Sequence, residues 1–155
     1  AGPPMIYAIG IDPGQTGGIA VGSADQQTAE AHRFPEDISN AMQLLRDLRG
    51  RSDIRLAAIE KVGAMPKQGV SSTFKFGANF GAWLGGLAAL DIPHVLITPA
   101  QWQRRMLDSG TGQTKERSLN MARRLFPQVD LRFKRDDGKA DALHLARFAL
   151  TQIPR

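Results

Sequence analysis

The fold of this chain is decided by residues 7–22, which read YAIGIDPGQTGGIAVG. The apolar run over residues 5–11 predicts a strand that is buried on both faces. Asp12 follows it directly, turn-forming residues come next, and residues 19–22 predict the second arm of a hairpin. A carboxylate after a buried strand is costly unless a hydrogen-bond donor or a cation compensates it. Asp12 is therefore either a cap bonded to its own turn or a functional group.

Size and composition narrow the class of protein. The chain has 155 residues, of which 42% are hydrophobic and 23% charged, as in a soluble globular protein. No apolar run is long enough to cross a membrane, so no membrane association is expected. We interpret residues 1–4 as a cloning remnant, which leaves residues 5–155 as one domain. No basic-then-apolar leader is present, and a cytoplasmic location is expected, free in a bacterial host cell or nucleoid-associated.

The residue types available restrict the chemistry. The chain has no cysteine and three scattered histidines. A metal would therefore be held mainly by oxygen, which favours Mg²⁺ or Mn²⁺. The charge is uneven, because residues 99–155 hold twelve Lys/Arg against six Asp/Glu, whereas residues 1–98 hold eight against nine. A basic half suggests a polyanionic partner, with nucleic acid the first candidate.

Further along the chain, hydrophobic periodicity predicts alternating strands and helices, and hence an α/β fold. Strands are predicted over residues 29–34, 54–59 and 92–97, and helices over residues 35–49, 74–90, 98–107, 115–126 and 138–152. The strand over residues 54–59 ends in Glu60, as the first strand ends in Asp12. Parallel strands carry functional groups at their carboxyl ends, so these two carboxylates are expected to converge.

The last predicted helix adds further acids. Asp137 and Asp141 lie four residues apart and so share one helix face, where like charges repel. A cation between them is one remedy. A favourable position near the helix N-terminus is another, but it explains Asp141 poorly because the helix is otherwise apolar there. With Asp12 and Glu60, these aspartates predict an oxygen-rich site for two divalent ions that promote phosphodiester hydrolysis.

The helix predicted over residues 74–90 is rich in small residues. Gly77, Gly81 and Gly85 recur every four positions, with alanines between them. Because glycine is unfavourable inside a helix, this repetition indicates close packing. The packing partner is either another element of the same chain or a second copy in a dimer.

Three stretches together resemble a known family. Residues 9–14 (IGIDPG), 57–62 (AAIEKV) and 137–143 (DGKADAL) resemble the acidic motifs of RuvC-type Holliday-junction resolvases, with bacteriophage and prophage versions the most similar. The resemblance implies a ribonuclease-H-like fold, with a five-stranded mixed sheet flanked by helices. It also implies a homodimer with two Mg²⁺ ions per active site, Mn²⁺ being an alternative. Such an enzyme makes paired nicks in four-way DNA junctions and uses no nucleotide cofactor.

The resemblance assigns roles to individual acids. Asp12, Glu60 and Asp141 match the family's catalytic, metal-binding acids. The fourth ligand often stands three residues before the last aspartate, where this chain has Gly138. Asp137 is our choice for that role, with Asp136 as the fallback.

The resemblance also implies contacts with DNA and with a second subunit. DNA phosphates are assigned to basic side chains, namely Lys67, Lys75, Arg104, Lys115 and Lys139. Gly77, Gly81 and Gly85 are assigned to the dimer interface. The aromatic residue that commonly wedges the junction open is replaced by Gly63. Phe74 and Phe76 are the candidate substitutes, although phenylalanine more often belongs to a core.

Other functions remain open from the sequence. Another ribonuclease-H-like nuclease, acting on branched DNA or RNA–DNA hybrids, fits the same acids. An actin-like or sugar-kinase-like ATPase also contains an Asp-x-Gly-x-Thr loop, as residues 12–16 do, but it needs a second such domain, for which 155 residues leave no room. A non-catalytic protein that binds and bends junctions would have no need for four converging acids.

Overall fold

The structure, a computed structural model, describes residues 4–61, 63, 69–110 and 112–154. Over these residues it has five strands and five α-helices, together with one 3₁₀ turn, η1. In chain order these are β1 (Tyr7–Asp12), β2 (Gly18–Ser23), β3 (Ala29–Arg33), α1 (Ile38–Arg51), β4 (Ile54–Glu60), α2 (Val70–Ala89), β5 (His94–Ile97), α3 (Pro99–Met106), α4 (Thr114–Leu125), η1 (Lys134–Asp136) and α5 (Asp137–Gln152).

The strands form one mixed sheet in the order β3-β2-β1-β4-β5. The β1, β2 and β3 strands form an antiparallel meander, whereas β4 and β5 continue the sheet parallel to β1. Ile11 of β1 lies beside Ile59 of β4. The next residue of each strand is therefore an acid, Asp12 or Glu60, at the same edge of the sheet. The predicted fold class and the predicted convergence of these strand ends are confirmed.

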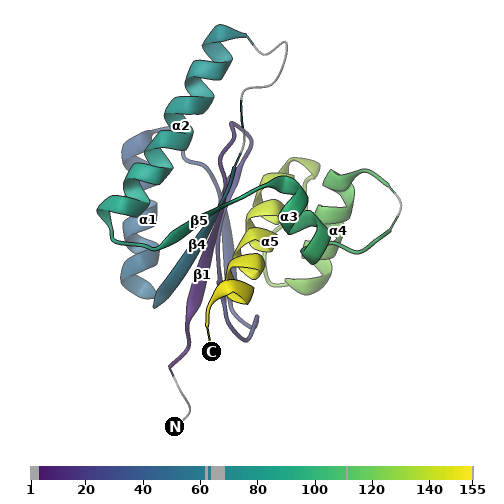
Figure 1. Ribbon diagram of the computed structural model, residues 1–155. Coiled ribbons are helices and arrows are strands. Elements are labelled where there is room, and N and C mark those ends of the chain that lie inside the picture. The colour runs from purple at the N-terminus through teal and green to yellow at the C-terminus, as the bar shows by residue number, and fades with distance from the viewer. Residues whose placement is uncertain (1–3, 62, 64–68, 111, 155) are drawn as a thin grey trace.

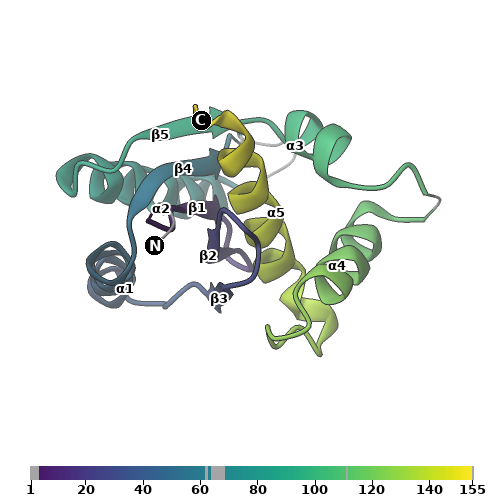
Figure 2. The same ribbon diagram turned by 90° about the horizontal axis from the view of Figure 1, so that it is seen from below.

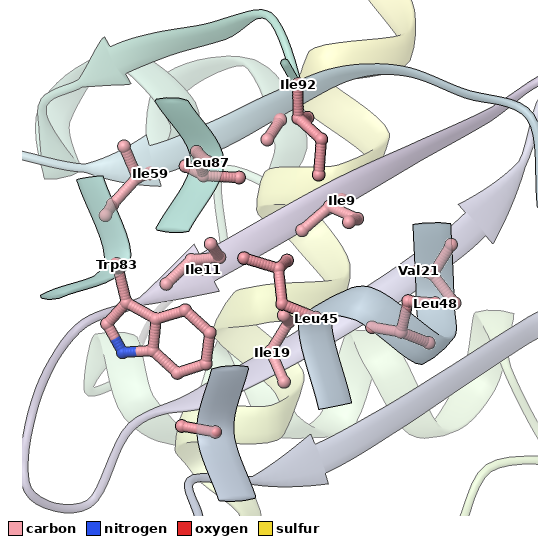
Figure 3. Close-up of a cluster of buried hydrophobic side chains, with 12 residues drawn as sticks. Ile9, Ile11, Ile19, Val21, Leu45, Leu48, Ile59, Trp83, Leu87 and Ile92 are labelled. Carbon is pink, nitrogen blue, oxygen red and sulfur yellow. The ribbon is translucent and has the colours of Figure 1, made fainter. Parts of the chain in front are cut away.

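Helices cover both faces of the sheet (Figures 1 and 2). On one face, α1 and α2 pack on large β-branched residues such as Ile9, Ile11 and Ile59 (Figure 3). On the other face, α3 and α5 pack on small residues, among them Ala8 and Ala58. Successive strand residues point to opposite faces, so isoleucine alternates with alanine or glycine in β1. This alternation lets α5 lie close to the centre of the sheet.

Helix α5 approaches β1 most closely at Gly10. A Cβ atom at this position would overlap the backbone carbonyl oxygen of Ala142 and the backbone nitrogen of Ala146. Because both obstacles are backbone atoms, rotation of a side chain cannot relieve the overlap. The absence of a side chain at Gly10 therefore sets the depth of α5, and with it the position of Asp141 relative to Asp12.

The substitution Gly10→Ala is expected to destabilise the protein by about 1–3 kcal/mol, because α5 must move away from the sheet to admit one methyl group. Urea unfolding monitored by circular dichroism would measure the change. Gly22→Ala in β2 is the matched control, since nothing lies within 4 Å of a Cβ atom there. Equal stability of the two variants would contradict this account of the β1–α5 contact.

Three predicted helix boundaries were wrong by two residues or more, the first being the start of α1, which lies at Ile38 after its Asp37 cap and not at residue 35. The α1 helix runs through Gly50, the predicted stop, and ends at Arg51, where the backbone N–H of Ser52 still bonds to the Leu48 carbonyl. The α2 helix begins at Val70 instead of Phe74. Its first turns project beyond the sheet and leave Val70 and Phe74 exposed, so no buried face produces a periodic signal there (Figure 1). Within the described residues, no helix has the length and apolar character needed to span a membrane.

Candidate active site

The acidic site lies where the carboxyl ends of β1 and β4 meet the first turns of α5. Asp12 ends β1, Glu60 ends β4, and Asp137 and Asp141 are supplied by α5. The turn after β1 closes through its backbone, because the Gly14 N–H donates to the Asp12 carbonyl oxygen at 3.1 Å. Within the described residues no donor bonds to the Asp12 carboxylate, which therefore does not serve as the cap of its own turn.

The acids interact strongly enough to change their protonation. Burial, together with the charges of Glu60, Asp141 and Asp137, raises the pKa of Asp12 to about 8, although the charge of Lys115 opposes this. Burial together with Glu60 and Asp137 raises the pKa of Asp141 to about 7, although a hydrogen bond from Ser118 opposes this. Burial also raises the pKa of Glu60. Acids far apart in the sequence thus share one anionic site.

Three of the acids are held by neighbouring side chains. The Trp102 indole Nε1–H donates to Glu60 Oε2 at 2.6 Å, and the Ser118 hydroxyl donates to Asp141 Oδ1 at 2.5 Å. The Lys115 ammonium lies 3.9 Å from Asp137 Oδ2. Trp102 and Ser118 are fully buried. Their hydrogen bonds therefore fix the orientation of Glu60 and Asp141 from beneath the site.

A second layer supports these two donors. His144 is buried and stacks on Trp102, with ring centroids 5.9 Å apart. Its Nε2 bonds to the Ser118 carbonyl oxygen at 2.9 Å, and its Nδ1 lies 2.9 Å from an Arg147 guanidinium nitrogen. Burial lowers the pKa of His144 to about 4, so the ring is neutral at pH 7. Since both ring nitrogens are engaged, His144 acts as a packing residue.

Sequence reasoning missed the roles of Trp102 and Ser118. The contact of the buried Trp102 with Glu60 spans 42 positions in the chain, so no local pattern indicates it. Ser118 carried no signal at all. A weak indication of its role is its position on the inner face of α4, which is otherwise lined by leucine and alanine. A serine buried on such a face needs a hydrogen-bond partner.

The two candidates for the fourth ligand, Asp136 and Asp137, have different surroundings. Asp136 is 1% exposed and accepts hydrogen bonds from Arg33 at 2.7 Å and from the Phe133 backbone N–H at 2.9 Å. It does not contribute to the charge around Asp12, whereas Asp137 does. A side chain at position 138 would overlap the Thr16 carbonyl oxygen. The fallback Asp136 therefore has a structural role. Position 138, three residues before Asp141, has no space for the side chain of a metal ligand.

The donor set was tested for its fit to a divalent cation. Four carboxylates and no sulfur suit a hard cation such as Mg²⁺ or Mn²⁺. Burial and the charge of the neighbouring acids raise the pKa values of Asp12 and Asp141, and a cation would stabilise their ionised forms. Across the described residues, no three Asp, Glu or His side chains are close enough to hold an ion as they stand. The chemistry of the site fits such a cation, and binding requires these side chains to move together.

The basic residues assigned to DNA have different surroundings. Lys67 lies outside the described residues. Lys75 lines a groove of about 740 Å³ with Gly14 and Gln15, the residues that follow Asp12 and Pro13. Arg104 is exposed on α3, and the Lys115 side chain is 80% exposed beside the acids. Lys139 is only 14% exposed and donates to the Asp130 carbonyl oxygen at 2.8 Å, so its ammonium group is already engaged within the protein.

The two candidate wedge residues differ in exposure. Phe74 is 77% exposed near the start of α2. Phe76 is half-buried and lines the same groove as Lys75. Neither belongs to the clusters of buried apolar residues in the described part of the chain. The expectation that phenylalanines there would form core therefore does not hold.

The small residues of α2 divide between two faces. A Cβ atom at Gly86 would overlap the Met42 sulfur of α1, so Gly86 serves packing within the chain. Gly77, Gly81 and Gly85 have no such neighbour within 4 Å. They form an exposed stripe together with Val70 and Phe74. Packing within the chain thus explains Gly86 and leaves this stripe uncovered.

This chain is similar to known proteins in its three-dimensional structure and not in comparisons of its sequence. No protein-family profile and no curated protein sequence matches the chain. RuvC from T. thermophilus in complex with a Holliday junction substrate has a TM-score of 0.62 at 19% identity, covering 91% of this chain and 90% of that one. A second structure of RuvC from Thermus thermophilus has a TM-score of 0.56 at 21% identity, covering 91% of each chain. The yeast mitochondrial Holliday junction resolvase Ydc2 has a TM-score of 0.50 at 17% identity, covering 92% of this chain and 77% of that one.

These alignments define the class of fold. The chain has the ribonuclease-H-like fold of the Holliday junction resolvases. Within that class, its architecture is that of RuvC, over nine-tenths of both chains. The family resemblance found in the sequence is thereby confirmed at the level of the fold.

The raised pKa values predict how the stability of the metal-free protein depends on pH. Asp12 and Asp141 hold protons in the folded state up to about pH 8 and 7, whereas both ionise near pH 4 when unfolded. The folded state therefore binds more protons, and stability falls as pH rises through this range. His144, with its lowered pKa, acts in the opposite sense below about pH 6.5.

Thermal unfolding in a metal chelator should consequently show a melting temperature that falls between pH 6.5 and 8. In Asp12→Asn this fall should be smaller, and the variant should be about 1–2 kcal/mol more stable at pH 8, because one buried charge is removed. This corresponds to roughly 2–8 °C for a chain of this size. A melting temperature that rises in wild type over the same interval would refute the proposed charge repulsion.

The substitution Trp102→Phe removes the donor to Glu60 while keeping an aromatic ring in place. The predicted nuclease activity should fall about 10- to 100-fold, as when hydrogen bonds that orient metal ligands are removed. Because this bond lowers the pKa of Glu60, the rising limb of the pH–rate profile should move to higher pH. Trp83→Phe is the control, since the buried Trp83 Nε1 has no hydrogen-bond partner among the described residues. Equal rates and equal pH profiles in both variants would contradict a positioning role for Trp102.

Proposed function

We propose that this protein is a metal-dependent endonuclease that resolves four-way DNA junctions. The observation that carries the proposal is the gathering of Asp12, Glu60, Asp137 and Asp141 at one edge of a RuvC-like sheet. The basic character of residues 99–155 supports a nucleic-acid substrate. RuvC from T. thermophilus, which has the same fold, has been observed in complex with a Holliday junction substrate.

The four acids are the residues that would hold two divalent ions. When bound, such ions would supply stabilisation of the charge on the phosphate and activation of water for phosphodiester hydrolysis. Trp102 and Ser118 hold Glu60 and Asp141 at the site, and the acids would draw closer together when the ions bind. Lys115 lies beside Asp137 with most of its side chain in solvent, which suits it to bind a phosphate next to the acids.

The groove between the loop after β1 and the start of α2 is the proposed path of one DNA strand. Gln15, Lys75 and Phe76 line it, together with the backbone of Gly14 and Gly69. Phe74 and Phe76 stand at the start of α2, where an aromatic ring would meet the bases at the centre of the junction. Either ring is suited to separate stacked bases, and we assign the wedge to this pair.

A dimer follows from the exposed stripe of α2. Gly77, Gly81 and Gly85 form the part of this stripe that continues beyond the exposed start of the helix, and none of them has a neighbour within 4 Å of a Cβ atom among the described residues. Glycines permit two helices to approach closely. We propose that a second copy of this chain packs there about a two-fold axis. Such a dimer carries two acidic sites and so can cut two strands of one junction.

The function is tested with synthetic four-way junctions, one mobile and one fixed, incubated with and without Mg²⁺ or Mn²⁺. The products of all four strands are resolved on denaturing gels. We expect paired nicks in opposing strands, only with metal. Linear duplex, flap and RNA–DNA hybrid substrates are the controls. Preferential cutting of hybrids or flaps would favour another ribonuclease-H-like nuclease, and junction binding without products would favour a non-catalytic protein.

A further inference from the structure

The turn that leads into α5 holds an aromatic ring in solvent. Phe133 is 46% exposed, although it stands only four residues before Asp137 of the acidic site. The guanidinium groups of Arg132 and Arg135 lie 5.5 and 5.0 Å from the centre of its ring. Lys134, between them in sequence, is also exposed. The site proposed above makes no use of these four residues, which we call the Phe133 platform.

Polar contacts from three different elements fasten this turn. The Asp136 carboxylate, itself anchored by Arg33 of β3, accepts from the Phe133 backbone N–H. From α4, Arg123 donates to the Leu131 carbonyl oxygen at 2.7 Å. From α5, Lys139 donates to the Asp130 carbonyl oxygen at 2.8 Å. The backbone on both sides of the exposed ring is therefore rigid.

This arrangement is uncommon for a solvent-exposed loop. An exposed phenylalanine has no favourable contact with water, and an immobile one has lost conformational freedom as well. Leu131, two residues earlier, is only 3% exposed. The same turn thus buries one apolar side chain and leaves the ring of Phe133 in solvent. A rigid exposed ring surrounded by cations is the arrangement with which proteins bind unpaired nucleotides.

We infer that the Phe133 platform binds an unpaired stretch of DNA next to the acidic site. One base stacks on the Phe133 ring, and the Arg135 guanidinium that it displaces binds a neighbouring phosphate, whereas Arg132 stays paired with Asp130. The inference rests on the proposed function, because it assumes that the substrate is DNA. It adds a second contact for unpaired bases, because Phe133 is not among the residues that line the groove at α2. No pairing of Arg135 or Lys134 with an acid occurs in the described part of the chain, so both cations are available for phosphate.

The platform is tested by binding experiments in a metal chelator, so that cleavage plays no part. The substitution Phe133→Trp places an exposed indole on the platform, and its fluorescence should be quenched by a short oligothymidylate or by a four-way junction. The unsubstituted protein, whose Trp83 and Trp102 are buried, gives the background signal. The same titrations with Phe133→Leu, which keeps an apolar side chain without a stacking face, provide the matched comparison.

Junction affinity at fixed salt should fall roughly 5- to 150-fold in Phe133→Ala and in Phe133→Leu, and should be retained in Phe133→Trp. In Arg135→Ala, the slope of log affinity against log salt should become about 0.7–0.9 shallower, as expected for one lost phosphate contact. Thermal unfolding verifies that each variant is folded.

Two results would overturn the inference, namely an unquenched indole at full DNA saturation or unchanged affinity in Phe133→Ala. If the unsubstituted protein binds and cuts junctions while either result is found, the platform assignment fails and the proposed function stands. If the unsubstituted protein binds no DNA, both fail. A quenched indole with oligothymidylate, combined with the affinity loss in Phe133→Ala, would establish the platform.

Discussion

The substitution Asp12→Asn is expected to lower the rate of junction cleavage by at least about a thousandfold, since it removes a charge that the metal-assisted reaction requires. Asp12 stands at the centre of the acidic site, where its pKa responds to all three other acids. Asparagine keeps the size of the side chain and relieves repulsion, so the variant should fold at least as well as wild type. Single-turnover cleavage of a labelled junction would measure the rate.

The same variant should bind the junction with undiminished affinity in a chelator, because it loses a negative charge near DNA. Asp25→Asn provides the control, since Asp25 is an exposed acid in the turn between β2 and β3. Cleavage by a folded Asp12→Asn at the wild-type rate would exclude the acidic site as the catalytic centre. The metal-dependent nuclease proposal would then be abandoned.

The substitution Gly81→Glu is expected to convert the proposed dimer into a monomer, weakening association at least about a hundredfold, because an unpaired carboxylate would be buried between two helices. Within the monomer the position is open, and glutamate is a better helix former than glycine, so the fold should be retained. Sedimentation equilibrium would report the oligomeric state. Cleavage of a cruciform plasmid would report its consequence, since paired nicks give a linear product and single nicks an open circle.

The matched control for this experiment is Gly50→Glu. Gly50 is also an exposed helical glycine, in α1, with nothing within 4 Å of a Cβ atom. It should leave both the oligomeric state and the linear product unchanged. A dimeric Gly81→Glu that still produces linear plasmid would show that the stripe on α2 is not the interface.

The sequence could predict those parts of the site that depend on local pattern. A buried strand that ends in an acid has a recognisable form, and parallel strands bring their carboxyl ends together. Asp12 and Glu60 are therefore predictable neighbours, as the register of Ile11 and Ile59 confirms. The spacing of Asp137 and Asp141 likewise places them on one helix face. The proximity of this face to the strand ends is then required by the fold.

Other parts of the site depend on contacts that have no local signature. The hydrogen bond from Trp102 to Glu60 joins residues 42 positions apart, and a buried tryptophan gives no indication of its partner. Asp136 and Asp137 are chemically identical neighbours. Only the position of Arg33 on β3 shows that Asp136 is bonded within the protein. The exposed start of α2 lacks hydrophobic periodicity because it has no core to cover, so its helical structure was also missed.

The close contact of α5 with Gly10 has a consequence for how activity is acquired. Two of the four acids belong to the last helix of the chain, and the same helix fills one face of the central strand. A polypeptide truncated before this helix would lack both the hydrophobic layer that stabilises the sheet and two of the four acids of the proposed catalytic site. Incomplete translation products should accordingly be harmless to the DNA of the cell that makes them.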